Sequence, residues 1–164
     1  MPLIYIALPI VLAIACYGEI KSRRIPNVLT LGSVLLGLAA WTVEGGMQGL
    51  GDSLLGLVIA GGAFLPFCLL GVVGGGDMKL MAAVGAITGY PMVLRVLTDT
   101  CIAGGLIAVA IMAWNGMLLE TMLNVFKIIF GMPRRRAGLR NPPMVPYALA
   151  ITIGTGVAVF FRTF

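Results

Sequence analysis

The sequence has few charged residues for its length. Only 10% of its 164 residues are charged, whereas 60% are hydrophobic and 23 are glycine. A soluble domain usually has about a quarter of its residues charged, and glycine is frequent in helices that pack together in lipid. The composition therefore predicts an integral membrane protein with a single domain, residues 1–164. It shows no base-reading module, so we expect lipid rather than nucleic acid around the chain.

Histidine is absent, and the three cysteines are not paired in sequence. Cys16, Cys68 and Cys101 each lie alone inside an apolar run, with no Cys-x-x-Cys spacing. A zinc site and a histidine-based catalytic triad both need residues that are missing here. We therefore predict no metal, no cofactor, and cysteines that act as small buried hydrophobic residues.

Long apolar runs dominate what is present. A membrane-spanning helix needs about 20 apolar residues. Six stretches qualify, at residues 2–18, 27–43, 54–73, 78–93, 96–115 and 145–162. Residues 118–130 have apolar positions at helical spacing, with polar residues between them, which is typical of a helix lying in the membrane interface. The predicted fold is an all-α membrane protein with six transmembrane helices and one cytoplasmic interfacial helix.

The basic residues orient this bundle. In a six-span arrangement, nine of the eleven fall on one side: Lys21, Arg23, Arg24, Lys79, Lys127, Arg134, Arg135, Arg136 and Arg140. Loops rich in Lys and Arg stay in the cytoplasm. We therefore expect the basic side to be cytoplasmic and both termini to lie outside. The segment EGGMQGLGD, residues 44–52, would then be a short outer loop.

Two of the six acidic residues are candidates for chemistry. Glu19 and Asp77 each lie where an apolar span meets the cytoplasmic side, and basic residues follow both. An ionisable group at this depth is costly unless it is paired or faces water, so it is a functional candidate by default. A second interpretation is open, in which the two carboxylates only anchor helix ends beside Arg23 and Lys79.

The three glycines before Asp77 favour the functional interpretation. Gly74, Gly75 and Gly76 let the backbone leave helical geometry, which is tolerated at membrane depth only where protein or water satisfies it. Asp77 would also lie near a helix N-terminus, where the dipole favours a carboxylate. Two such acids facing each other across a water molecule would share one proton, because adjacent negative charges repel.

These residues resemble a known family. Gly74 to Asp77 fit the GxGD motif of intramembrane aspartic proteases. GGGDMKLMAAVGA, together with KSRRIPNVLTLG upstream and VPYALAITIG downstream, resembles prepilin peptidases. The match is to the short form that serves Tad (Flp-type) pili, and it covers nearly the whole chain.

The resemblance implies an aspartic endopeptidase whose two catalytic acids meet at the cytoplasmic membrane face. Its substrates would be Flp-type prepilins, whose class III leader peptides are cleaved after a glycine that precedes the hydrophobic segment. Larger relatives also methylate the new terminus through an insert with zinc-binding cysteines. This sequence has no such insert and no Cys-x-x-Cys pairs, so methylation is not implied.

The second family aspartate matches Asp77, but the first falls on Glu19, six residues before Ile25. Glutamate keeps the acid and extends it by one methylene, about 1.5 Å of reach. Misplacement on that scale costs up to about 100-fold in rate. The supporting motif residues would be Gly74, Gly76, Lys79, Pro26 and Asn27. Lys79 either tunes Asp77 or only extends to the interface, and Pro26 suits the first turn of the second span.

Three alternatives accompany the prepilin peptidase hypothesis. One is a GxGD protease that cleaves other membrane proteins. Another is a catalytically silent homologue that binds pilins or assembly proteins, which the glutamate at position 19 keeps open. Transport is the least favoured, because the sequence has no evident inverted repeat and no charge at the middle of a span.

Overall fold

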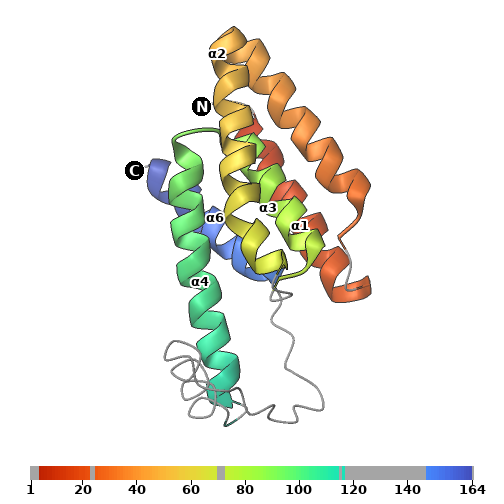
Figure 1. The fold of residues 1–164 in the computed structure, drawn as a ribbon, viewed down its shortest axis with the longest axis vertical. Helices are drawn as coiled ribbons and strands as arrows, with labels where there is room; N and C mark the ends of the chain where they lie inside the picture. The colour runs from red at the N-terminus through yellow and green to blue at the C-terminus, as the bar shows by residue number, and fades with distance from the viewer. Residues whose placement is uncertain (1–3, 23–24, 70–72, 115, 117–146, 164) are drawn as a thin grey trace. The chain divides into compact units, whose positions relative to one another are not determined.

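The computed structural model describes residues 4–22, 25–69, 73–114, 116 and 147–163 (Figure 1). All regular secondary structure within these residues is helical. The helices are α1 (Ile4–Ser22), α2 (Asn27–Leu69), α3 (Gly75–Thr88), α4 (Met92–Trp114) and α6 (Tyr147–Thr163). The predicted interfacial helix at residues 118–130 and the basic residues 127–140 lie outside the described residues.

The chain divides into two compact units. The first comprises Met1–Ala103 and Pro146–Phe164, and the second comprises Gly104–Val145. The description below concerns the first unit, because all the predicted site residues fall within it.

Helix α2 is a hairpin of two helical arms. Gly46 lies inside it with φ 58° and ψ −140°, a conformation that glycine adopts easily. Figure 1 shows the chain rising in orange, turning, and returning in yellow beside itself. The arms, residues 27–45 and 47–69, are about 28 and 34 Å long at 1.5 Å per residue. The length of each arm is therefore close to or greater than the thickness of the hydrocarbon core of a bilayer, which is ~30 Å.

The hairpin corrects the loop predicted at residues 44–52. Helical structure continues on both sides of Gly46, so the turn is confined to a single residue. Gly49 on the second arm packs directly against the backbone of Trp41 on the first, which leaves no room for a side chain there. The glycines of this segment, which we interpreted as a sign of a loop, instead form a tight turn and let the two arms pack closely.

Helix α3 lies against both arms of α2, and glycines set the spacing. A Cβ added to Gly37 on the first arm would lie 2.8 Å from the carbonyl of Ala86. On the second arm, a Cβ on Gly56 would overlap the carbonyl of Gly85. Small residues allow helices in lipid to approach this closely. The α3 side chains facing the protein interior are fully buried, and the largest are Leu80, Met81, Val84 and Ile87.

The C-terminal carbonyls of α3 are bonded by side chains of α2. Ser53 donates its hydroxyl to the carbonyl of Ala86 at 2.7 Å, and the indole N–H of Trp41 donates to that of Ile87 at 2.9 Å. Gly89 then leaves the helix with φ 66°. The last carbonyl groups of a helix have no partner within the helix, so these two side chains supply the hydrogen bonds that water would otherwise make.

The predicted spans also differ from the helices at this end of α3. We predicted a span at 78–93, but α3 ends at Thr88 and α4 begins at Met92. Gly89 and the Pro91 that follows explain the earlier break, because neither favours continuation of the helix. At 14 residues, α3 is only about 21 Å long.

Among the helices of the described residues, two are long and apolar enough to cross a membrane: Asn27–Leu69 and Met92–Trp114. Shorter apolar helical stretches cover Ala7–Glu19 and Ala148–Phe160. Large apolar side chains such as Val28, Leu36 and Val58 on α2 are more than half exposed, as expected of a surface that faces lipid. The described residues thus form an all-helical protein with membrane-spanning helices, and the count of six spans stays a prediction.

Helices α1 and α6 pack against each other. Leu8, Leu12 and Ala15 on α1 are buried, as are Ala148 and Ile151 on α6. Near the ends of these faces the thiol of Cys16 and the hydroxyl of Thr152 form a hydrogen bond of 3.0 Å. Of the cysteines predicted to be buried, Cys16 and Cys68 are half-buried, but Cys101 is exposed.

Candidate active site

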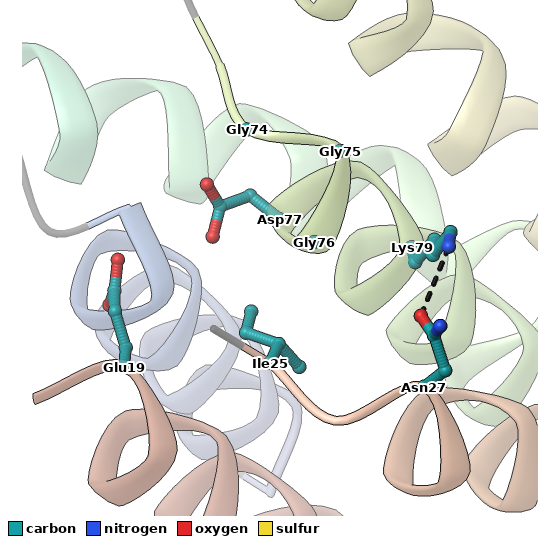
Figure 2. A pocket seen from close by; sticks show the side chains of 8 residues that line it. All are labelled: Glu19, Ile25, Asn27, Gly74, Gly75, Gly76, Asp77 and Lys79. Atoms are coloured by element: carbon teal, nitrogen blue, oxygen red, sulfur yellow. Dashed lines mark hydrogen bonds between the residues drawn. The ribbon is translucent and has the colours of Figure 1, made fainter. Parts of the chain in front are cut away.

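A cavity of about 370 Å³ lies where α1 ends and where α2 and α3 begin. Its walls contain six of the seven residues that the sequence singled out. The lining residues are Glu19, Ile25, Asn27, Gly74, Gly75, Gly76, Asp77 and Lys79 (Figure 2). Pro26 is the one predicted residue that does not line it.

Asp77 lies in the first turn of α3. Gly74 is the N-cap residue, and its carbonyl accepts the backbone N–H of Asp77 at 3.1 Å. The side chain of Asp77 is only 9% exposed, and Figure 2 shows its carboxylate pointing into the cavity. The N-terminus of α3 offsets part of the cost of an ionised carboxylate at this buried position.

The three glycines do not play equal parts. Only Gly74 has non-helical backbone, with φ −70° and ψ 148°, and Gly75 already begins the helix. A Cβ on Gly74 would lie 3.0 Å from Oδ2 of Asp77, whereas a Cβ on Gly75 would meet nothing within 4 Å. A Cβ on Gly76 would make ordinary contact with Ile25 at 3.5 Å. Of the three glycines, only Gly74 therefore lies before the helix, and its missing side chain leaves room for the carboxylate.

Glu19 reaches the same cavity from the last turn of α1. It is half-buried, and Oε2 accepts a hydrogen bond of 3.2 Å from the backbone N–H of Ala148 in α6. Figure 2 shows the side chains of Glu19 and Asp77 entering the same space from different helices. The fold thus brings together two acids that are 58 positions apart in the sequence.

Lys79 and Asn27 form the other side of the cavity. The ammonium group of Lys79 donates to the side-chain oxygen of Asn27 at 3.0 Å, which links α3 to the start of α2. In Figure 2 this pair lies away from the carboxylate of Asp77. The described partner of Lys79 is therefore an amide on a neighbouring helix.

Pro26 acts on the backbone next to the cavity. Its carbonyl accepts the N–H groups of Leu29 and Thr30 at 3.1 and 3.3 Å, so it precedes the first turn of α2. The sequence prediction that Pro26 starts this helix is confirmed to within one residue.

Sequence reasoning missed two participants. Ile25 lines the cavity together with the two acids, and the backbone N–H of Ala148 donates a hydrogen bond to Glu19. A backbone donor has no residue-type signal, so only the position of Ala148 in the VPYALAITIG segment pointed to this region.

The pair of acids can perform general acid–base chemistry. One carboxylate can take a proton from a water molecule while the other carboxyl group donates one to a substrate carbonyl. The cavity is large enough for a peptide bond and a water molecule, since a water molecule occupies about 30 Å³.

One of three comparisons with known proteins gives a match. Neither the curated proteins nor the solved structures contain a match to the chain. The model of the type IV leader peptidase family matches residues 6–109, which include both acids and the whole of α2 and α3. Members of this family are aspartic-type peptidases that act on prepilins. Since the match covers more than half of the sequence, the chain belongs to the type IV leader peptidase family.

Proposed function

We propose that the protein is an aspartic endopeptidase that removes class III leader peptides from Flp-type prepilins, with Glu19 and Asp77 as its catalytic pair. The observation that carries the proposal is the placement of these two carboxyl groups on opposite walls of one cavity. Membership in the type IV leader peptidase family supports both the reaction and the class of substrate.

The reaction follows from two acids that share one proton. The ionised carboxylate takes a proton from water as the water oxygen bonds to the scissile carbonyl carbon. The protonated partner gives its proton to the carbonyl oxygen, which forms a tetrahedral diol. The carbon–nitrogen bond then breaks as the protonated acid gives its proton to the leaving nitrogen and the other carboxylate takes a proton from a diol hydroxyl, so that the pair again holds one shared proton. After the two products leave, the pair is again singly protonated and can bind another substrate and water molecule.

We place the cavity at the cytoplasmic face of the bacterial inner membrane, in a bundle of six spans. Lys21 lies two residues after Glu19, and Lys79 lines the cavity itself, so basic residues gather at this end. Glu44 lies at the opposite end of the first α2 arm, beside the Gly46 turn. This distribution is the one expected if positive charge stays on the cytoplasmic side.

Co-expression with a Flp-type prepilin tests the function. We expect the parent protein to shift the prepilin to higher gel mobility, and Asp77→Asn to abolish the shift, because an amide cannot act as a base. Glu44→Gln is the matched control, since Glu44 is an exposed carboxylate at the end of the first α2 arm that does not line the cavity. Normal processing by a well-expressed Asp77→Asn protein would rule out the proposed pair.

The glutamate at position 19 favours one other candidate, a silent homologue that binds prepilins without cutting them. That protein would give no mobility shift, and cleavage would appear only after Glu19→Asp restores the family residue. The same assay therefore separates the two functions.

A further inference from the structure

The carboxylate of Glu19 is held by the first turn of α6. The backbone N–H of Ala148 donates to Oε2 at 3.2 Å, and Ala148 itself is fully buried. Backbone N–H groups in the first turn of a helix have no partner within the helix, so they are free to bond an acid. The dipole of α6 adds a favourable field for a negative charge at this point.

A second contact fixes the same turn of α6. Thr152 donates its hydroxyl to the carbonyl of Ala148 at 2.7 Å, and that hydroxyl also lies 3.0 Å from the thiol of Cys16. Cys16 precedes Glu19 by about one helical turn, and Thr152 follows Ala148 by about one turn. Helices α1 and α6 are therefore joined at two successive levels, and the level nearer the cavity is the bond to Glu19.

We infer that the backbone N–H of Ala148 is a positioning group that orients the carboxylate of Glu19 toward Asp77. The inference rests on the proposed function and assigns a part in it to α6, which lies beyond the residues matched by the family model. Glutamate has one more rotatable bond than aspartate, so its carboxylate samples more positions. A hydrogen bond to a fixed backbone group selects one of them.

Removing this single N–H tests the inference. Ala148→Pro deletes the donor, and proline is tolerated in the first turn of a helix. Leu149→Pro is the matched control, because it places proline in the same turn at a residue that is 38% exposed. Both variants, purified in detergent, would be assayed with a synthetic prepilin peptide that contains the leader, the glycine and the hydrophobic segment.

We expect Ala148→Pro to lower kcat about tenfold with KM unchanged, since a misplaced acid slows chemistry but not binding. Leu149→Pro should keep the kcat of the parent. Equal kcat values for parent and Ala148→Pro, or equal losses in the two proline variants, would overturn the inference while leaving the proposed function intact. A parent protein that cleaves no prepilin would overturn both.

A double-mutant cycle separates positioning from damage to α6. In a Glu19→Asp background the carboxylate is about 1.5 Å shorter and falls out of reach of the amide, so Ala148→Pro should then change kcat less than twofold. The same tenfold loss in both backgrounds would contradict positioning. Thr152→Val gives an independent test if the proline variant does not fold: it keeps the side-chain shape and should lower kcat a few-fold only when Glu19 is present.

Discussion

Gly74 leaves room for the carboxylate of Asp77: a Cβ on Gly74 would lie 3.0 Å from Oδ2. Contacts this short force the flexible partner to move by a few tenths of an ångström. We therefore expect Gly74→Ala to lower prepilin cleavage several-fold, since the carboxylate is displaced from its position opposite Glu19. The measurement is the rate of cleavage in detergent, together with the thermal unfolding midpoint.

Gly75→Ala is the control for this prediction. Its added Cβ meets nothing within 4 Å and its backbone is already helical, so cleavage should stay near the parent value. If both alanine variants lose activity to the same extent, the requirement at Gly74 is one of backbone flexibility rather than of space beside Asp77.

Substitutions at Glu19 give the second prediction. Glu19→Gln should abolish cleavage, because an amide can neither hold nor exchange the shared proton. Glu19→Asp should keep activity or raise it, because it restores the side-chain length of the family motif. Quantifying the mature pilin in membranes would measure both. If Glu19→Gln processes prepilin as well as the parent, another acid must pair with Asp77.

The close packing of α2 and α3 predicts a specific pattern of stability. Gly56→Ala places a methyl group against the carbonyl of Gly85, so the two helices must separate at a cost of about 1–3 kcal/mol. Gly62→Ala lies on the same arm, has no neighbour within 4 Å, and should stabilise the helix by about 0.5–1 kcal/mol. Thermal unfolding in detergent should therefore move in opposite directions for the two variants. Parallel shifts would contradict the packing described for this arm.

The orientation in the membrane is open to direct labelling. In a background that lacks Cys16, Cys68 and Cys101, we expect Lys21→Cys to react with a membrane-impermeant maleimide only from the cytoplasmic side. Glu44→Cys should react only from the outer side, because it lies at the far end of the first α2 arm. Reaction of both positions from one side would contradict the six-span orientation and the cytoplasmic location of the cavity.

The sequence predicted the family and the helical fold, because the evidence for both is local. The GGGD motif and the spacing between Glu19 and Ile25 lie in short segments, and the family match confirms the family to which they pointed. The structure also places Glu19 and Asp77 on one cavity, as the motif suggested. Their catalytic role stays a prediction.

Other features could not be predicted from the sequence, because they depend on contacts between distant residues. The turn at Gly46 is concealed among several glycines, and only the packing of Gly49 on Trp41 distinguishes a tight hairpin from a loop. The contribution of Ala148 is a backbone N–H, which no side-chain pattern encodes. Apolar periodicity could not locate the end of α3, because residues on both sides of Gly89 are equally hydrophobic.

The hydrogen bond between Glu19 and Ala148 also sets an order of events during biosynthesis. The two residues are 129 positions apart, so the ribosome completes α1, α2 and α3 well before it makes the amide that holds Glu19. Until α6 has been synthesised and inserted, a nascent chain contains both acids without this bond to orient the first. The chain should therefore reach its full cleavage activity only after α6 has joined α1.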